Sequence, residues 1–191
     1  MKFTISILLS LGFFLNSFSQ FKSQSSEKEK RLYNYIKDHA VVESESLGFN
    51  AVMESQIWKR ADSLFRNLSF TKTLAYFHDS SYAVKFYAFL KLLYLNDNLA
   101  FDYLKSTIDD TTRLYFTFGD LGGFGRFNQL IVDEYGDFLY YRYKNNWSLD
   151  PPERHYFGNK RSHFPKANLK IWEKKYKEFY NLVQVHGLKY Q

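Results

Sequence analysis

The segment from Tyr82 to Leu95, with the sequence YAVKFYAFLKLLYL, decides the fold. It is apolar on nearly every side of a helix, and Lys85 and Lys91 are its only charged residues. A helix of a soluble domain that is apolar all round is buried between neighbouring elements. We therefore expect this helix to be the central element of the core.

Further helices are predicted on both sides of this segment. Apolar residues between Ala51 and Leu68 recur at the three-to-four-residue spacing of an amphipathic helix. The same kind of pattern predicts helices over residues 27–42, 71–77, 99–107, 127–143 and 168–183. The fold class expected is all-α, a single domain built as an irregular or repeat-like helical bundle.

The segments between these helices are read as loops and turns. We expect 43–49 to be a loop, 111–116 to add a last helical turn, and the glycine-rich Gly119–Gly125 to be a turn between helices. For residues 130–143 a β-hairpin folded at Glu134–Asp137 is an alternative to helix. We favour the helix, although Gly136 costs it about 1 kcal/mol.

The first nineteen residues have the layout of a secretory signal peptide. Met1 and Lys2 form a basic start, an apolar run extends from Phe3 to Leu15, and small residues precede a cleavage point after Ser19. The apolar run is shorter than the roughly 20 residues that span a membrane. We therefore expect an exported protein, periplasmic or extracellular, without a membrane span in the mature chain.

The rest of the chain is long enough for one domain with a sizeable core. We divide it into a polar lead-in (20–29), a helical core (30–143), a basic-aromatic loop (144–165) and a C-terminal helix with its tail (166–191). The loop contains Pro151 and Pro152 and has no periodicity. A loop of that length is uncommon and is either functional or disordered.

Charge is distributed unevenly along the chain. The net charge is +7 from Arg142 to Gln191 and −2 from Gln20 to Tyr141. Such asymmetry indicates an anionic partner, and cations interleaved with flat rings suit anionic polymers, whose bases or sugars stack on the rings. The candidate binding residues are Trp147, Arg154, His155, Lys160, Arg161 and His163. The alternative is that these rings pack on the core and the cations are solvated.

Several chemistries find no support in the sequence. The chain has no Cys, which excludes thiol catalysis and Cys-ligated metal. Gly119–Gly125 lacks the residues of a phosphate-binding or dinucleotide loop, and His155 and His163 do not have the spacing of a zinc site. We expect no catalytic residue, no cofactor and no metal. Arg126, at a predicted helix start, is a candidate anion contact that lacks a second ligand.

One stretch resembles a known family. A short helix at 71–77 ends near an Asp, and the next helix carries a Val, a basic residue and an Ala in the pattern of a HEAT-like helical repeat: Asp79, Val84, Lys85, Ala88 and Leu92. A degenerate second copy starts at Leu99, with Asp109 as its Asp. This layout, over about 40 to 60 residues, also resembles short exported proteins of Bacteroidetes-type bacteria. The resemblance implies an α-solenoid-like stack with a binding or scaffolding role.

Together these observations predict an exported, non-catalytic helical interaction module that contacts an anionic envelope component or a protein partner. The alternative is a small exported hydrolase acting on polysaccharide or nucleic acid, with an acid and a histidine assembled in space. We favour binding over catalysis. Nothing in the sequence indicates sequence-specific nucleic-acid recognition, and the oligomeric state is left open.

Overall fold

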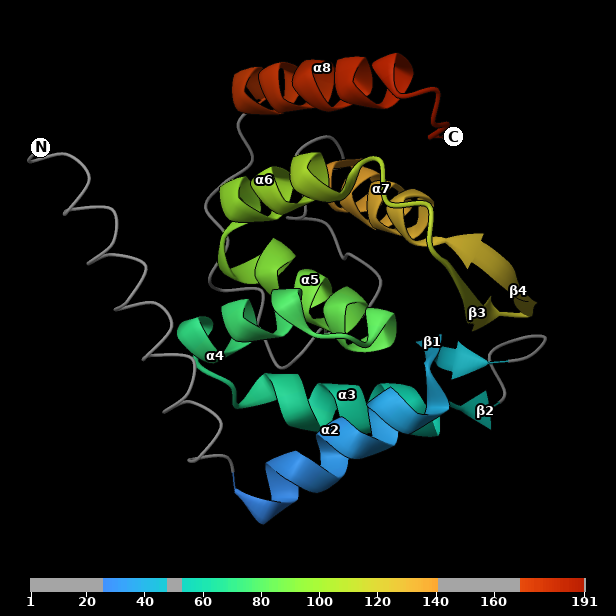
Figure 1. Cartoon of the computed structure of the whole chain (residues 1–191). Helices are drawn as coiled ribbons and strands as arrows, with labels where there is room; N and C mark the ends of the chain where they lie inside the picture. Colours follow the sequence, from blue (N-terminus) through green and yellow to red (C-terminus); the bar gives the residue numbers. More distant parts are fainter. Residues whose placement is uncertain (1–25, 48–52, 141–168, 191) are drawn as a thin grey trace, which may run out of the picture.

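The computed structural model describes residues 26–47, 53–140 and 169–190 (Figure 1). The elements are α2 (Glu27–His39), β1 (Val41–Leu47), β2 (Met53–Glu54), α3 (Gln56–Arg66), α4 (Phe70–Ala75), the 3-10 turn η2 (Tyr76–His78), α5 (Tyr82–Leu95), α6 (Asp97–Thr107), β3 (Arg113–Gly119), β4 (Leu121–Arg126), α7 (Phe127–Leu139) and α8 (Leu169–Val185). The expected all-α class is wrong, because the helices are joined by a four-stranded mixed sheet.

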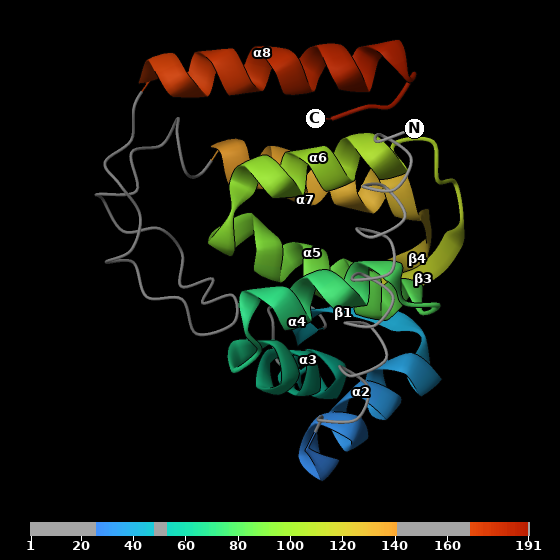
Figure 2. The ribbon, with the colours of Figure 1, turned by 60° about the vertical axis from the view of Figure 1, so that its left-hand side comes forward.

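The helices form a stack that runs from one end of the molecule to the other. Helices α2 and α3 lie side by side at one end, α4 and α5 form the next level, α6 and α7 lie beyond α5, and α8 lies across α7 at the far end (Figures 1 and 2). The sheet flanks one side of this stack. Within the described ranges, no helix combines the length and apolar character that crossing a membrane requires.

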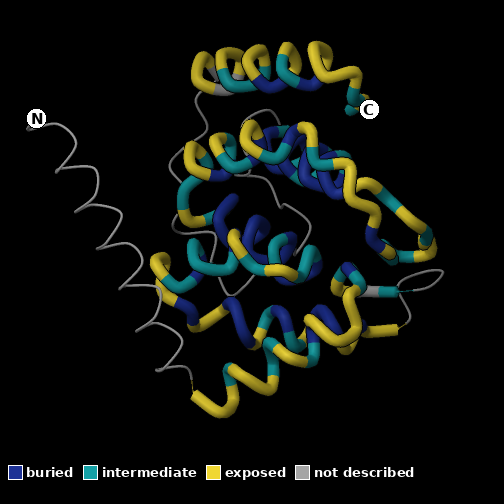
Figure 3. The backbone as a smooth tube through the Cα atoms, in the orientation of Figure 1, coloured by how far each residue is buried: buried dark blue, intermediate teal, exposed yellow. Residues whose placement is uncertain are grey.

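Helix α5 is the centre of the core, as the sequence predicts. It contacts α2, α3, α4, α6 and α7 as well as β1, and its residues are mostly buried (Figure 3). Lys91 is buried too, and burial lowers the pKa of its amine, a shift opposed by the nearby charge of Asp62. The all-round apolar pattern therefore reports the central position of α5 correctly.

Short polar residues set where most of these helices begin. Ser26, Ser55, Ser69, Ser81 and Asn96 each accept a hydrogen bond from a backbone N–H in the first turn of the helix that follows. Such caps satisfy donors that the helix itself leaves free. Helix α7 is the exception among these described N-termini, because its N-cap residue is Arg126 and no side chain caps it.

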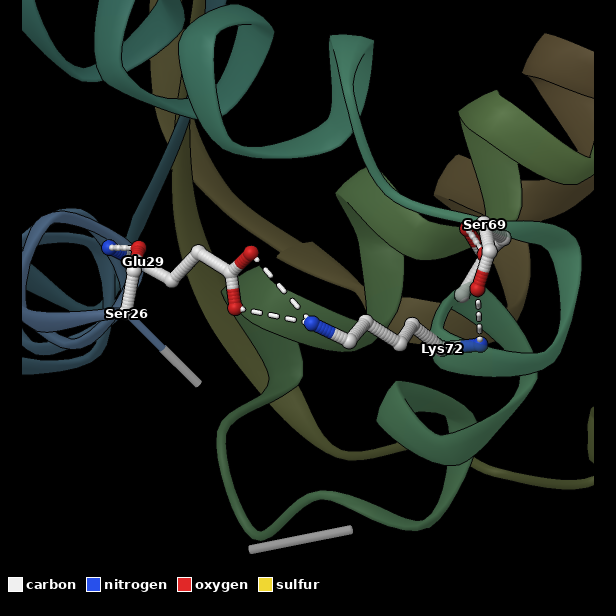
Figure 4. A network of polar contacts seen from close by, with 5 residues as sticks. Ser26, Glu29, Ser69 and Lys72 are labelled. Carbon is white, nitrogen blue, oxygen red and sulfur yellow. Dashed lines mark hydrogen bonds and ion pairs between the residues drawn. The ribbon is translucent and has the colours of Figure 1, made fainter. Parts of the chain in front are cut away.

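A side-chain ion pair joins helices α2 and α4. Figure 4 shows Glu29 of α2 and Lys72 of α4, whose carboxylate and amine are 3.1 Å apart, each next to a helix-capping serine. Both side chains are about one quarter exposed. A half-buried pair of this kind contributes at most about 1 kcal/mol, so it orients α2 against α4 more than it stabilises the fold.

The sheet is built from segments that the sequence analysis treats as loop or helix. Residues 43–49, expected as a loop, largely form β1, and residues 111–116, expected as a helical turn, largely form β3. Strands β1 and β3 pair in parallel, with Val41 opposite Tyr115. The segment 41–47 is short and mostly polar, and its strand state depends on a partner some seventy residues away. Local pattern could not show that partner.

A buried tyrosine fixes the irregular middle of β1. The register between β1 and β3 shifts between Glu43 and Leu47. There the Tyr87 hydroxyl of α5 donates to the Glu43 carbonyl oxygen (3.0 Å) and accepts from the Glu43 N–H (2.8 Å). Ser44 Oγ accepts from the Gly119 N–H at 3.0 Å. Side chains thus satisfy backbone groups that a regular ladder would pair.

The glycine-rich segment is a β-hairpin, not a turn between helices. Strands β3 and β4 pair antiparallel from Arg113–Arg126 to Phe118–Leu121, with a two-residue turn at Gly119 and Asp120. Gly119 has φ +62°, the left-handed conformation that the first position of such a turn requires. Gly125 allows close packing, since a Cβ there would lie 3.2 Å from the Phe116 ring. The glycines therefore serve the hairpin.

For residues 130–139 the choice of helix over hairpin is confirmed, because α7 is continuous from Phe127 to Leu139; residues 141–143 of that prediction lie outside the described residues. Helix α8 packs against α7 and is held by two polar contacts, one near its middle and one just past its C-terminal end. Lys175 Nζ lies 2.7 Å from Asp97 Oδ2 at the start of α6, and His186 Nδ1 lies 2.8 Å from Asp109 Oδ1. The C-terminal helix is thus part of the same core.

Candidate functional site

The outward face of the β3–β4 hairpin carries two cations beside two rings. Residues opposite each other in an antiparallel pair point to the same face, so the pairs Arg113–Arg126 and Tyr115–Phe124 share one face. The Tyr115 and Phe124 rings meet edge to face at 5.3 Å, and the Arg113 guanidinium lies 6.0 Å from the Phe124 ring centroid. Tyr115 is 41% exposed and Phe124 67%. These rings are available to a ligand.

This face forms one wall of a pocket of about 480 Å³. The other walls are the C-terminal end of α2 and the N-terminal end of α5. The volume falls within the range of small-ligand sites. The lining residues are Lys37, His39, Ala40, Val41, Ser80, Ser81, Tyr82, Ala83, Arg113, Leu114, Tyr115 and Phe124. None of these residues is a carboxylate, so the pocket has the character of an anion site.

The cations around this pocket have no acidic partner. Among the described residues, no carboxylate forms an ion pair with Lys37, Arg113 or Arg126. Arg113 and Arg126 lie directly opposite each other on neighbouring strands, an arrangement of like charges that destabilises a sheet. An anion between or beside the two guanidinium groups would relieve this repulsion.

Chain reversal after α2 positions His39. Ala40 has φ 51°, which ends the helix and turns the chain into β1, and its N–H donates to the Ile36 carbonyl oxygen. The His39 ring stacks on Tyr35 with centroids 4.0 Å apart. Its Nδ1 lies 2.8 Å from the Tyr35 carbonyl oxygen. Because a carbonyl only accepts, Nδ1 carries the proton, and Nε2 is the ring nitrogen left for a ligand.

The two acids near the start of α5 are committed to internal hydrogen bonds. Asp79 accepts from the Tyr33 hydroxyl (2.8 Å) and from the Ser81 N–H (2.7 Å). Asp110 accepts from the Tyr82 hydroxyl at 2.9 Å. Burial alone would raise the pKa of Asp110, but hydrogen bonds from Thr112 and Tyr82 and the charge of Lys85 lower it. Asp110 therefore positions the Tyr82 side chain of the pocket, and Asp79 fixes the backbone of Ser81 in its wall.

The N-terminal end of α5 adds a favourable field for an anion. Its first turn lines the pocket together with Ser80 and Ser81. The free N–H groups of a helix start carry partial positive charge. This contribution supplements the side-chain cations and does not by itself define a site.

The six binding residues predicted from sequence, Trp147, Arg154, His155, Lys160, Arg161 and His163, all lie outside the described residues. Arg126, for which the sequence offered no second anion contact, lies opposite Arg113 on the neighbouring strand. The two cations could therefore contact the same anion. Within the described ranges, no group of three or more His, Asp or Glu side chains is arranged to hold a metal ion.

Sequence reasoning missed Lys37, His39, Arg113, Tyr115 and Phe124. One signal was present. Arg113 to Phe118 alternates between outward Arg113, Tyr115 and Thr117 and inward Leu114, Phe116 and Phe118, which is the two-residue period of a half-buried strand. The lone residues Lys37 and His39 carry no signal, because only tertiary packing brings them to the hairpin.

No family model, curated protein or solved structure matches this chain at a significant level. The resemblance to HEAT-like repeats therefore stays a proposal, and the functional argument depends on the geometry of the pocket alone.

Proposed function

We propose that this protein is an exported, non-catalytic binding module that contacts an anionic envelope component through the pocket and the outward face of the β3–β4 hairpin. The observation that carries the proposal is the Arg113–Arg126 pair beside the exposed Tyr115 and Phe124 rings. Guanidinium groups bind phosphate, sulfate and carboxylate, and flat rings stack on sugars or bases. An acidic polysaccharide or a headgroup with both features fits this chemistry.

Binding is favoured over catalysis at this pocket for a chemical reason. Hydrolysis of a glycosidic bond uses a pair of carboxylic acids, and the pocket lining contains none. His39 is the one imidazole among the lining side chains, and no described acid forms a hydrogen bond with it. The residues present can hold and orient an anion.

The test measures binding of the full mature chain to heparin, a sulfated polysaccharide, by calorimetry over a range of salt concentrations. Arg113→Glu should weaken binding about tenfold or more and reduce its salt dependence, since one cation contact becomes repulsive. Lys105→Glu is the matched control. Lys105 is exposed on α6 and pairs with Asp102, so the same charge change should alter affinity less than about twofold.

Three results would overturn the proposal. Equal loss of affinity in Arg113→Glu and Lys105→Glu would mean that net charge alone drives binding. Release of new reducing ends from the polysaccharide would show a hydrolase. A Lys160→Glu, Arg161→Glu double variant separates the hairpin face from the basic-aromatic loop predicted from sequence, because loss in that variant alone would assign the contact to the loop.

A further inference from the structure

Strand β4 is an edge of the sheet with hydrogen-bonding groups on its outer side. In the strand order β2-β1-β3-β4 it pairs with β3 alone among the described strands. The Phe127 N–H donates to the Thr112 carbonyl oxygen at 2.8 Å, which makes that pair hydrogen-bonded. By the alternation of an antiparallel ladder, the backbone groups of Gly122, Phe124 and Arg126 point away from β3.

Apart from the charge of Arg126 at its end, this edge lacks the features that keep edge strands from pairing. It has no Pro and no Lys, and its register with β3 is unbroken from Arg113–Arg126 to Phe118–Leu121. Leu121 and Phe124 are 68% and 67% exposed. A regular edge with exposed large apolar side chains is a template for another strand. The hairpin also lies at the periphery of the molecule (Figure 1).

We propose that the β4 edge pairs with β4 of a second copy of this chain, antiparallel and centred on Gly123, to form a two-fold dimer. In that register the outward groups of both strands meet, since Gly122 lies opposite the partner's Phe124. On the same face, Asp120 at the hairpin turn lies opposite the partner's Arg126. On the other face, Leu121 lies opposite the partner's Gly125.

The β4 edge is complementary to itself, which favours a second copy of this chain as the pairing strand and favours this register. Apart from the central Gly123, which lies opposite the partner's Gly123, each glycine of β4 faces a large residue across the new ladder, as when an aromatic side chain covers a cross-strand glycine. Two ion pairs form per dimer, because a two-fold contact occurs twice. If the centre of the contact moves one residue toward the turn, Gly122 lies opposite the partner's Gly122. If the centre moves one residue the other way, Phe124 lies opposite the partner's Phe124. Both leave Arg126 without Asp120.

The presence of an arginine at position 126, where it carries two costs for the monomer, supports a role for this residue in such a contact. It occupies the N-cap of α7 without capping it, although Ser, Thr, Asp or Asn there would stabilise the helix by about 1 kcal/mol. Its side chain lies on a face with Arg113, which disfavours it further. Asp120 of a second copy would compensate both costs.

The dimer goes beyond the proposed ligand site and does not depend on it. It would join the two sheets into one and bring the two outward faces, each with Arg113, Tyr115 and Phe124, side by side. A polymer spanning both faces would bind with higher avidity than one face allows.

The test is sedimentation velocity of the full mature chain from micromolar to millimolar concentration. We expect a monomer–dimer equilibrium in the wild type. Asp120→Arg and Arg126→Asp each place like charges opposite each other, so each should weaken dimerisation about tenfold or more. The double variant Asp120→Arg, Arg126→Asp restores opposite charges and should recover the wild-type equilibrium. Asp102→Arg on α6 is the control, with the same charge change at another exposed site.

Amide exchange provides an independent measurement. In the dimer the amides of Gly122, Phe124 and Arg126 should become protected, while those of Gly123 and Gly125, already paired with β3, should change little. A wild type that stays monomeric at millimolar concentration overturns the proposal. So does a dimer that tolerates Asp120→Arg, or protection without this alternation. Circular dichroism of each variant checks that the fold is intact.

Discussion

Gly136 in the middle of α7 provides a sharp test of how the C-terminal tail docks. A Cβ at this position would lie closer than 3.0 Å to three ring carbons of Tyr190, a separation that real Cβ atoms essentially never show. Tyr190 follows α8; its ring packs edge to face on Phe179 (5.5 Å), and its hydroxyl donates to Asp137 at 3.2 Å. The glycine therefore makes room for the tail.

The magnitude follows from two opposing effects of Gly136→Ala. Alanine gains about 1 kcal/mol of helix propensity over glycine. Displacing the Tyr190 ring loses an aromatic contact of about 1 kcal/mol and a hydrogen bond of about 1 kcal/mol, together with some apolar burial. We expect Gly136→Ala to destabilise the wild type by about 1–2 kcal/mol. In a Tyr190→Ala background it should stabilise by about 1 kcal/mol, so the coupling is about 2–3 kcal/mol.

Urea unfolding of the four proteins in this double-mutant cycle measures the coupling. A Tyr180→Ala background is the control. Tyr180 lies on α8 and is exposed, with its ring stacked on Tyr176, so Gly136→Ala should remain destabilising there. A Gly136→Ala effect that is equal in the wild-type and Tyr190→Ala backgrounds would refute the docked position of Tyr190.

Two further predictions concern buried polar groups. Burial raises the pKa of Asp133 to about 6, with the charge of Asp137 acting in the same direction and a hydrogen bond from Gln129 opposing it. The native state therefore binds the carboxyl proton more tightly than the unfolded state, and the stability this contributes is lost as pH rises through about 6. Asp133→Asn should stabilise the protein by about 1 kcal/mol at pH above 7, and the difference in stability should vanish near pH 4. Thermal unfolding of both proteins across this pH range measures the difference. A gain in stability that is the same at all pH values would contradict the prediction. Tyr87→Phe removes both hydrogen bonds to the Glu43 backbone and should cost about 2–3 kcal/mol, because it leaves partly buried backbone groups unpaired. Its urea midpoint should fall while the midpoint of Tyr180→Phe stays near the wild-type value.

Local pattern was sufficient wherever a segment's own residues select its conformation. The apolar run of α5 indicated a central buried helix, and the helix of residues 127–139 prevailed over the hairpin alternative. Gly136, a local cost to that helix, is explained only by Tyr190, a residue more than fifty positions away. Propensity alone could show the cost of this glycine and not its reason.

The candidate site could not be predicted in the same way. The residues that line it come from the end of α2, the start of α5 and the β3–β4 hairpin. Arg126 was recognisable as a possible anion contact, but its neighbour Arg113 belonged to a segment interpreted as helix. An error of one residue in the boundary of an element changes little. Interpreting a strand as a helical turn has a larger effect, because it removes the alternation that sets which side chains share a face.

The sequence by itself determined the elements whose stability is local, namely the helices with an apolar stripe or an all-round apolar surface. Only the tertiary structure decided the sheet. Strand β1 is short and polar, and it becomes a strand because β3, Tyr87 and Ser55 satisfy its backbone and side chains. Helices close their hydrogen bonds within one segment, whereas strands need partners from elsewhere in the chain. The pocket depends on that pairing.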